Sequence, residues 1–280
     1  MKTIGFVDYY IDEWHANNYP AWLKEICEKS NPEFKVAYAW AEVDRHPEGG
    51  QRTTAEWCGD FGVEQCRTLE ELCEKSDYIL VLAPSNPEKH LGYAETVLKY
   101  GKRTYIDKTF APDFATAEKI FALAKKYNTP FFSSSALRYA DELKGVSAQS
   151  VMTTGGGRSL EEYIIHQTEM VVKLLGTGAK RAQVEVGAEK ICRVEYGDGR
   201  SAVMIYDEGL PFNVYVKKEN GETAFLPIVS QYFKNLLSDI LHFYETGEKS
   251  FCGGETLEVM KVREAVIKGE KNPGVWVEIR

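Results

Sequence analysis

The first half of the chain alternates short apolar runs with longer amphipathic stretches. The run from Tyr78 to Ala83 is almost continuously apolar, a pattern typical of a strand that is buried on both faces of a parallel sheet. Runs of this kind predict strands at residues 3–7, 34–40, 78–83, 103–106 and 130–133. Helical periodicity between them predicts helices at residues 19–29, 69–74, 87–100 and 113–127. Repeated strand–helix–strand units favour an α/β fold with a Rossmann-like, doubly wound parallel sheet.

The second half follows a different pattern, in which turn residues separate short strands. Three glycines, Gly155 to Gly157, precede a predicted long helix at residues 159–175. Strands are predicted after it at residues 182–186, 191–196, 202–206, 212–216, 223–226 and 275–279, and helices at residues 230–244 and 255–268. The segments Gly197-Asp198-Gly199 and Glu219-Asn220-Gly221 are typical of hairpin turns. These features predict an α+β domain with a mostly antiparallel sheet.

The change of pattern divides the chain into two predicted domains. Residues 1–140 form a Rossmann-like, nucleotide-binding-type domain, and residues 141–280 form a shortened α+β domain for substrate and dimer contacts. One face of the second sheet is expected to stay open. Because exposed apolar strand faces are a liability, we expect that face to pair in a homodimer or higher homo-oligomer.

Charge and composition narrow the class of partner. The net charge of −8 disfavours nucleic acid and anionic membranes, which both attract basic surfaces. The N-terminal residues lack the apolar core of a signal peptide, and no segment approaches the roughly 18 apolar residues of a membrane span, so a cytoplasmic protein is expected. The six cysteines form no C-x-x-C pair, which favours reduced thiols and predicts no metal site.

Two candidate functional segments follow predicted strands directly. The turn from Pro84 to His90 comes after the most buried strand, and Lys108 follows the strand at residues 103–106. In doubly wound sheets, ligands bind just beyond the carboxyl ends of the strands. A lysine there is suited to donate to a substrate hydroxyl or carbonyl. The alternatives are an ordinary strand-to-helix turn and a surface lysine paired with Asp107.

The third candidate lies on the predicted helix at residues 159–175. Glu162, His166, Glu169 and Lys173 are spaced four, three and four residues apart, so they form one polar stripe. A histidine flanked by carboxylates is oriented, and its charged form is favoured, which suits a general acid or base. The alternative is a solvated stripe of ion pairs.

The order and spacing of these segments resemble the Gfo/Idh/MocA family, which includes glucose–fructose oxidoreductase and inositol dehydrogenase. The turn from Pro84 to His90 is similar to the family's Pro-Asn-x-x-His turn, and Asp107-Lys108-Thr109 takes the place of its Glu-Lys-Pro motif. Two more segments fit: Val97 to Lys102, and the glycine-led stretch from Gly155 to His166. The resemblance covers nearly the whole chain.

The resemblance implies roles for particular residues. Lys108 matches the family's catalytic lysine and His166 its catalytic histidine, while Glu162 replaces an aspartate that works beside that histidine. In the family these groups move a proton to or from a sugar hydroxyl while NAD or NADP takes the hydride. The expected cofactor-binding residues, most of them near strand ends, are Asp8, Glu42 (or Asp44), Pro84, Asn86 and His90.

The phosphate loop departs from the family pattern. Rossmann proteins carry G-x-G-x-x-G after the first strand, whereas here Gly5 lies inside the strand and the turn from Asp8 to His15 has no glycine. Asp8, Asp12 and Glu13 lie where the pyrophosphate would bind. Each like-charge contact at about 5 Å costs roughly 1 kcal/mol in water and roughly 3 kcal/mol at an intermediate dielectric. NAD(H) is therefore expected to bind with a dissociation constant on the order of millimolar, unless the turn is remodelled with Asp12 capping the first helix.

Three functions are compatible with these features. The first is an NAD(P)-dependent oxidoreductase acting on a sugar, polyol or related hydroxy compound. The second is a lyase, isomerase or hydrolase that uses the same lysine and histidine without a redox cofactor, and the third is a non-catalytic sugar-binding subunit. For either enzyme, we expect Lys108, His166 and Glu162 to converge on one cleft.

Overall fold

The computed structural model describes residues 1–30, 33–49 and 51–280. The chain divides into two units. The first comprises Met1–Ser133 and Leu236–Ser250, and the second comprises Ser134–Asn235 and Phe251–Arg280. The chain therefore leaves the first unit a few residues before the boundary expected at residues 140/141. It also returns to that unit with one helix that the sequence pattern assigns to the second domain.

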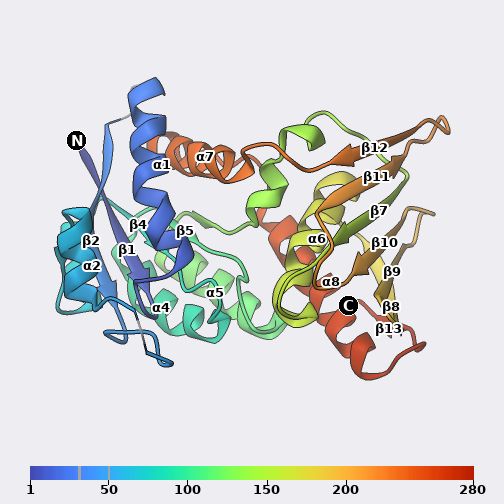
Figure 1. Cartoon of the computed structure of the whole chain (residues 1–280), viewed down its shortest axis with the longest axis horizontal. Coiled ribbons are helices and arrows are strands. Elements are labelled where there is room, and N and C mark those ends of the chain that lie inside the picture. Colours follow the sequence, from blue (N-terminus) through green and yellow to red (C-terminus); the bar gives the residue numbers. More distant parts are fainter. Residues whose placement is uncertain (31–32, 50) are drawn as a thin grey trace. The chain divides into compact units, whose positions relative to one another are not determined.

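The first unit contains a six-stranded sheet in the order β3-β2-β1-β4-β5-β6 (Figure 1). Every described strand pairing in this sheet is parallel. The strand order is that of a doubly wound Rossmann sheet, which confirms the predicted α/β class. The strands are β1 (Lys2–Asp8), β2 (Phe34–Ala41), β3 (Glu64–Gln65), β4 (Tyr78–Val81), β5 (Thr104–Ile106) and β6 (Phe131–Phe132). The two-residue β3 is not predicted from the sequence, because both of its residues are exposed and polar.

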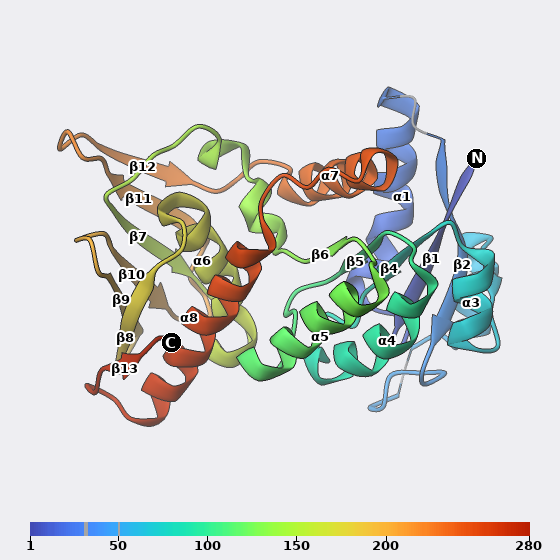
Figure 2. The same cartoon turned by 180° about the vertical axis from the view of Figure 1, so that it is seen from behind.

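Helices lie on both faces of this sheet (Figure 2). They are α1 (Trp14–Ser30), α2 (Thr54–Phe61), α3 (Leu69–Lys75), α4 (His90–Val97), α5 (Phe114–Tyr127) and α7 (Tyr232–Thr246). The helix predicted at residues 87–100 is instead α4 flanked by the 3-10 turns Pro87–Lys89 and Leu98–Tyr100. Helix α2, which was not predicted, begins with a capping box between Thr53 and Glu56. Helix α7 joins the first unit through Tyr244, whose hydroxyl donates to the carbonyl of Ile79 at 2.7 Å.

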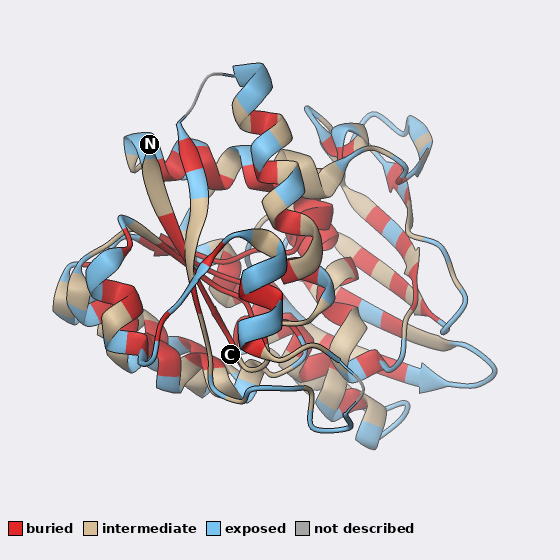
Figure 3. Ribbon diagram, turned by 60° about the vertical axis from the view of Figure 1, so that its left-hand side comes forward, coloured by how far each residue is buried: buried red, intermediate tan, exposed pale blue. Residues whose placement is uncertain are grey.

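The central strands form the core of the first unit, as the buried ribbon in Figure 3 shows. Ile4, Phe6, Ile79 and Leu80 are all 0% exposed. Gly5 has a packing role within β1, because a Cβ there would lie 2.3 Å from Ser76 Oγ and under 3 Å from Leu72. This glycine therefore allows the α3 segment to approach the sheet closely.

The second unit contains a seven-stranded sheet in the order β12-β11-β7-β10-β9-β8-β13. The strands are β7 (Ser150–Gly155), β8 (Ala179–Val186), β9 (Lys190–Tyr196), β10 (Ser201–Tyr206), β11 (Asn213–Lys217), β12 (Thr223–Pro227) and β13 (Val277–Glu278). Strand β7 pairs with β10 in parallel, and the other described pairings are antiparallel, which confirms a mostly antiparallel sheet. Both predicted hairpins form, between β9 and β10 and between β11 and β12.

Strand β7 is the principal element that the sequence pattern misses. It includes the first of the three glycines, and its side chains alternate between buried and accessible, with few apolar residues. Gly156 follows it, where a Cβ would lie 1.9 Å from the carbonyl oxygen of Asp207. The glycine run therefore allows two backbone segments to meet, beside the helix α6 (Leu160–Leu175) that follows.

Helices α6 and α8 (Gly253–Lys271) pack on this sheet. An apolar patch made of Met152, Tyr215 and Phe225 is accessible, with side chains 42%, 42% and 61% exposed. Tyr215 is the register partner of both Met152 and Phe225, so the three residues are neighbours across β7, β11 and β12. The patch is the feature on which the expected dimer contact rests.

Two further observations concern the cysteines and the length of the apolar helices. Four of the six cysteines are buried, and none of the six, all of which lie in the described residues, forms a disulfide. None of the helices in the described part of the chain is long and apolar enough to cross a membrane.

Candidate active site

The carboxyl ends of β1, β4 and β5 bring the first group of candidate residues together. These strands are parallel neighbours, so the residues that follow them meet at one edge of the sheet. Asp8 Oδ1 accepts a hydrogen bond from the backbone N–H of Ala83 at 3.1 Å. Ala83 has a φ of 56°, a left-handed conformation that favours glycine. Lys108 Nζ donates to the carbonyl of Pro84 at 3.4 Å, so the structure brings Pro84 and Lys108 together.

Asp107 is buried beside Lys108 and is held by three partners, one of which is the Tyr105 hydroxyl, which donates to Oδ1 at 3.3 Å. Its Oδ2 contacts His15 Nδ1, and its Oδ1 accepts from the backbone N–H of Lys108 at 2.8 Å. Burial alone would raise the pKa of Asp107, but the opposite charges of His15 and Lys108 and the hydrogen bonds lower it overall. The His15 ring stacks on Tyr19, with ring centroids 5.1 Å apart. His15 belongs to this buried cluster, although nothing in the sequence pattern singles it out.

Glu13 caps the N-terminus of α1. Its Oε2 accepts from the N–H of His15 at 2.8 Å and its Oε1 from the N–H of Ala16 at 2.5 Å. Burial raises the pKa of Glu13, although His15 and the two N–H groups act against that rise. Glutamate is not among the usual capping residues, which is why the sequence predicts a later start for this helix.

Asp8, at the end of β1, is 1% exposed. Its pKa is raised well above the usual range, chiefly by burial and then by the charge of Glu13. Its Oδ1 accepts from the N–H groups of Tyr9 and Ala83, while its Oδ2 has no hydrogen-bond partner among the described residues. Burial and the neighbouring negative charge thus both disfavour the ionised form of Asp8.

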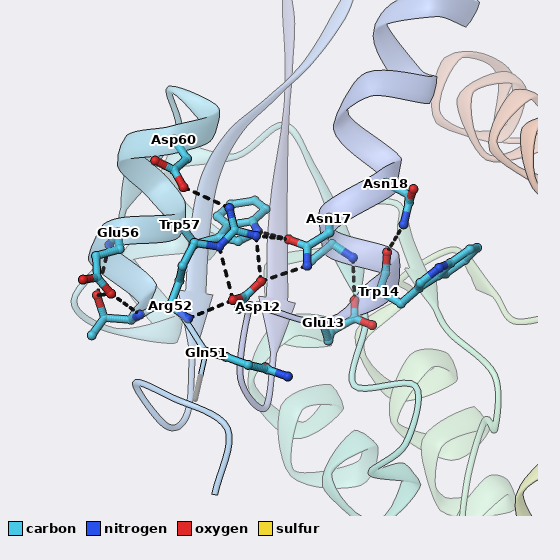
Figure 4. A network of polar contacts seen from close by, with 12 residues as sticks. Asp12, Glu13, Trp14, Asn17, Asn18, Gln51, Arg52, Glu56, Trp57 and Asp60 are labelled. Carbon is cyan, nitrogen blue, oxygen red and sulfur yellow. Dashed lines mark hydrogen bonds and ion pairs between the residues drawn. The ribbon is translucent and has the colours of Figure 1, made fainter. Parts of the chain in front are cut away.

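Asp12 does not cap the helix, so that alternative is wrong. Its carboxylate pairs with Arg52, with Arg52 Nη2 at 2.7 Å from Oδ1 and the Arg52 N–H at 2.8 Å from Oδ2 (Figure 4). Asn17 adds a hydrogen bond of 2.8 Å to the same group. Partial burial works against ionisation, yet these bonds lower the pKa of Asp12 to about 2. Asp12 thus ties the loop to the segment before α2.

These contacts decide how well the site fits a dinucleotide. In Rossmann proteins the pyrophosphate accepts hydrogen bonds from the N–H groups at the N-terminus of the first helix. Here the Glu13 carboxylate accepts the hydrogen bonds of those N–H groups. The expected ribose anchor, Glu42, is also engaged, by Lys89 Nζ at 2.5 Å and by the Tyr93 hydroxyl at 2.7 Å. The residues present do not fit NAD or NADP bound through this helix in the usual way.

The other residues expected to bind the cofactor are Asn86 and His90, which follow β4, and Asp44, which follows β2. Asn86 Nδ2 donates to Glu88 Oε1 at 3.1 Å, a local contact within the turn. Asp44, the alternative to Glu42, accepts from the N–H of Thr54 at 3.1 Å. The His90 ring is 0% exposed and lies between the carbonyls of Leu82, at 2.6 Å, and Phe110, at 3.0 Å.

Burial lowers the pKa of His90, although both carbonyls favour its charged form. A buried ring that joins the loops after β4 and β5 serves the fold of this edge. The His90 ring thus links the two segments that carry Pro84 and Lys108.

In the second unit, His166 lies on α6 and contacts Ser135. The His166 Nδ1 and Ser135 Oγ atoms are 2.7 Å apart. Glu162 accepts from Arg158 Nη2 at 2.5 Å. Glu169, at the next position of the stripe, is 3% exposed and pairs with Arg138, so the stripe is not a solvated row of charges. Ser135 and Arg138 were missed because neither lies in a periodic element.

Lys108 belongs to the first unit, and His166 and Glu162 belong to the second. Their convergence on one cleft remains a prediction. No group of three or more histidine, cysteine or acidic side chains within the described residues has the arrangement of a metal site.

Comparison with known proteins finds a family that part of the chain resembles. A family model described as an oxidoreductase family with an NAD-binding Rossmann fold matches residues 22–134, a segment that begins inside α1 and so excludes the capped loop. The uncharacterised oxidoreductase YhhX of Escherichia coli (strain K12) is 37% identical over 57 residues, which cover 20% of this chain and only 16% of that protein.

Solved structures extend the likeness of the fold to the whole chain. The myo-inositol dehydrogenase of Lactobacillus casei, solved with NAD(H) and myo-inositol, is 12% identical with a TM-score of 0.82, covering 100% of this chain and 97% of that one. The UDP-N-acetylglucosamine 3-dehydrogenase of Acidithiobacillus ferrooxidans is 12% identical with a TM-score of 0.75, covering 96% and 97%. Residues 22–134, less than half of the chain, are thus similar to the Gfo/Idh/MocA oxidoreductase family with its NAD-binding Rossmann fold, and the solved structures show that the whole chain shares the fold of these dehydrogenases.

Proposed function

We propose that this protein is an oxidoreductase that acts on a hydroxyl group of a sugar, polyol or related compound. The observation that carries the proposal is the position of Lys108. It follows β5 at the carboxyl edge of a Rossmann sheet, inside the matched segment, with its Nζ 3.4 Å from the carbonyl of Pro84 at the end of β4. Substrates of doubly wound sheets bind at that edge.

The proposed chemistry needs groups that exchange a proton with the substrate oxygen. A lysine amine and a histidine ring both do this near neutral pH when they are positioned within hydrogen-bonding reach. Lys108 is half-buried, and the backbone around it is fixed by Asp107. His166 Nδ1 lies 2.7 Å from Ser135 Oγ, a contact that orients the ring on α6. Lys108 and His166 are thus the proposed proton-transfer groups, with Glu162 beside them.

NAD or NADP is the proposed hydride acceptor, and its affinity is expected to be low. Binding through the N-terminus of α1 requires the Glu13 carboxylate to leave the two N–H groups that it now accepts from. We therefore keep the expected dissociation constant for NAD(H) on the order of millimolar. The proposed substrate class is that of the inositol and UDP-sugar dehydrogenases that share the fold. Their sequences are each only 12% identical to this chain.

The test is a turnover assay with NAD⁺ and NADP⁺ at concentrations above about 5 mM, over a panel of polyols and sugars. We expect Lys108→Ala and His166→Ala each to lower turnover by about 10² or more. Unchanged turnover in both variants contradicts the proposed roles.

A second function is favoured by one observation, the Glu13 cap. A chain that fills its own pyrophosphate position is suited to acid–base chemistry without a redox cofactor, as in a lyase, an isomerase or a hydrolase that uses the same lysine and histidine. Isothermal titration separates the two proposals. Binding of a sugar together with no detectable binding of NAD(H) or NADP(H) favours the redox-independent enzyme.

A further inference from the structure

Helix α1 begins with an exposed aromatic side chain, that of Trp14. All aromatic residues of the first unit lie in the described part of the chain, and Trp14, at 52% exposure, is the only one of them that is exposed. The other aromatic side chains of this unit are buried or half-buried. A single exposed tryptophan is not unusual on a protein surface. Its packing and its position therefore decide what it can do.

The packing of Trp14 holds its ring in a defined orientation while half of the side chain stays accessible. The ring centroids of Trp14 and Trp22 are 5.6 Å apart, with 68° between the ring planes. Those of Trp14 and His15 are 5.3 Å apart, with 67° between the planes. Both are edge-to-face contacts, which are a favourable arrangement of aromatic rings. Trp22 packs in turn on the buried Tyr19, at a centroid distance of 6.1 Å.

Trp14 lies next to residues of the proposed reaction site. The ring of its neighbour His15 contacts Asp107, which accepts the backbone N–H of Lys108 at 2.8 Å. In Figure 4 the Trp14 side chain points away from the ion pairs of Arg52. Because α1 follows β1 directly, Trp14 lies at the carboxyl edge of the parallel sheet, where ligands of doubly wound proteins bind.

A polar side chain accompanies the Trp14 ring. Asn18 lies one turn further along the same face of α1, and its Nδ2 donates to the carbonyl of Trp14 at 2.7 Å. A carboxamide both donates and accepts hydrogen bonds, so it suits a ligand that is rich in hydroxyl groups. A flat apolar surface beside such a group matches a cyclic sugar or polyol, which has an apolar C–H face and a rim of hydroxyls.

We propose that Trp14 is a substrate-binding residue that stacks on the C–H face of a cyclic sugar or polyol, and that it thereby selects ring-shaped substrates over open-chain ones. The inference rests on the function proposed above and adds the shape of the substrate to it. An open-chain polyol has no fixed flat face, so it must lose conformational freedom before it can cover the indole ring.

The planar bases of a dinucleotide also stack on aromatic side chains, but this occupant is disfavoured. Such a base is joined to phosphate groups. Glu13, the residue before Trp14, accepts the N–H groups of His15 and Ala16 that a phosphate would need, and it carries a like charge. A neutral sugar ring on Trp14 has no such conflict with Glu13.

The test follows the indole N–H signals of the five tryptophans in ¹H–¹⁵N spectra of the full chain. The signal of Trp14 is identified by its loss in Trp14→Phe. The probes are myo-inositol and glucose as rings, and sorbitol as the open-chain polyol. We expect the rings to shift the Trp14 signal, and sorbitol to bind at least about tenfold more weakly than the better ring.

Isothermal titration of variants measures what the stacking contributes. Trp14→Ala should weaken the binding of the ring by about tenfold, which corresponds to about 1.4 kcal/mol, and Trp14→Phe should weaken it less because it keeps an aromatic face. Trp276→Ala is the matched control. It removes a half-buried tryptophan that packs against Arg181 in the second unit, and it should leave the affinity unchanged.

Several outcomes overturn the proposal. They are a Trp14 signal that moves with neither ring, a signal that moves only with nicotinamide mononucleotide or adenosine monophosphate, equal affinity for rings and sorbitol, and equal affinity of the wild type and Trp14→Ala for a ring.

Turnover separates these results from the proposed function. A protein that oxidises a polyol without any response at Trp14 keeps the proposed function and loses this inference. A response of Trp14 to a ring, without reduction of NAD⁺ or NADP⁺, keeps Trp14 as a sugar-binding residue and contradicts the oxidoreductase.

Discussion

Removing the carboxylate of Glu13 should increase the affinity of the protein for NAD(H). Glu13 now accepts the N–H groups of His15 and Ala16, the two donors that a pyrophosphate would need at the N-terminus of α1. In Glu13→Ala these donors become available and one negative charge is lost. In Glu13→Gln the charge is lost, but the side-chain oxygen can still accept from the helix.

The size of the effect follows from charge and hydrogen bonding. A like-charge contact at about 5 Å costs roughly 1–3 kcal/mol, depending on the dielectric. Taking about 2 kcal/mol for Glu13→Ala gives an increase in affinity of about 30-fold, from millimolar towards tens of micromolar. We expect a smaller gain for Glu13→Gln. Loss of the cap should also reduce the free energy of unfolding of Glu13→Ala by about 1 kcal/mol.

Isothermal titration with NAD(H) measures these affinities, and raising the salt concentration should shrink the gain because the repulsion is screened. Glu28→Gln is the matched control, since it removes the same charge from an exposed position on the same helix. Equal affinity in the wild type and both Glu13 variants would refute the reasoning. A wild-type dissociation constant below about 10 µM would refute it as well, because the cap would then not hinder the pyrophosphate.

Three further predictions follow from buried charges and from the open sheet. Asp8→Asn should melt above the wild type, and the difference in melting temperature should widen as the pH rises above about 4, the usual pKa of a free aspartate. Burial raises the pKa of Asp8 in the fold, so the stability contributed by its protonated form is lost as the pH rises, and a difference that stays constant in thermal melts would contradict this assignment. Glu169→Ala should lower the free energy of unfolding by about 1–3 kcal/mol in denaturant titrations, since it removes one of the two carboxylates that pair with buried Arg138 and leaves Glu255. A loss below about 0.5 kcal/mol would show that the Glu169 pair contributes little. Sedimentation should show a dimer at micromolar concentration that Phe225→Glu weakens, and a wild type that is monomeric throughout would remove the open sheet face as a dimer contact.

Much of the fold could be predicted from the sequence, because the strands of the first sheet are apolar runs with clear helical stretches between them. The observed order of the strands is one of the two that are common in the doubly wound class, and the sequence pattern does not choose between them. Strands β3 and β7 escaped prediction for a physical reason, since their accessible and polar side chains give no hydrophobic signal. The return of residues 236–250 to the first unit depends on non-local packing of Phe243 and Tyr244, which no local pattern records.

The candidate site was predictable in part. Lys108 and Pro84 follow neighbouring strands, so their proximity follows from topology. The acidic loop was recognised as an obstacle to pyrophosphate binding, but the residue that caps the helix was not, because Glu13 replaces the usual short capping side chains. Glu169 was predicted only as one member of the polar stripe on its helix. Its burial against Arg138 comes from a segment 31 residues away in sequence, which a helical stripe does not reveal.

The most direct measurement of the proposed function is the rate at which reduced nicotinamide appears when the wild type and Lys108→Ala are mixed with a polyol panel and saturating NAD⁺ or NADP⁺. We expect a substrate-dependent rate in the wild type and a rate about 10² lower in Lys108→Ala, with an unchanged dissociation constant for the cofactor. Absence of cofactor reduction with every polyol, in a protein that still binds a sugar, would contradict the oxidoreductase proposal and leave the redox-independent enzyme.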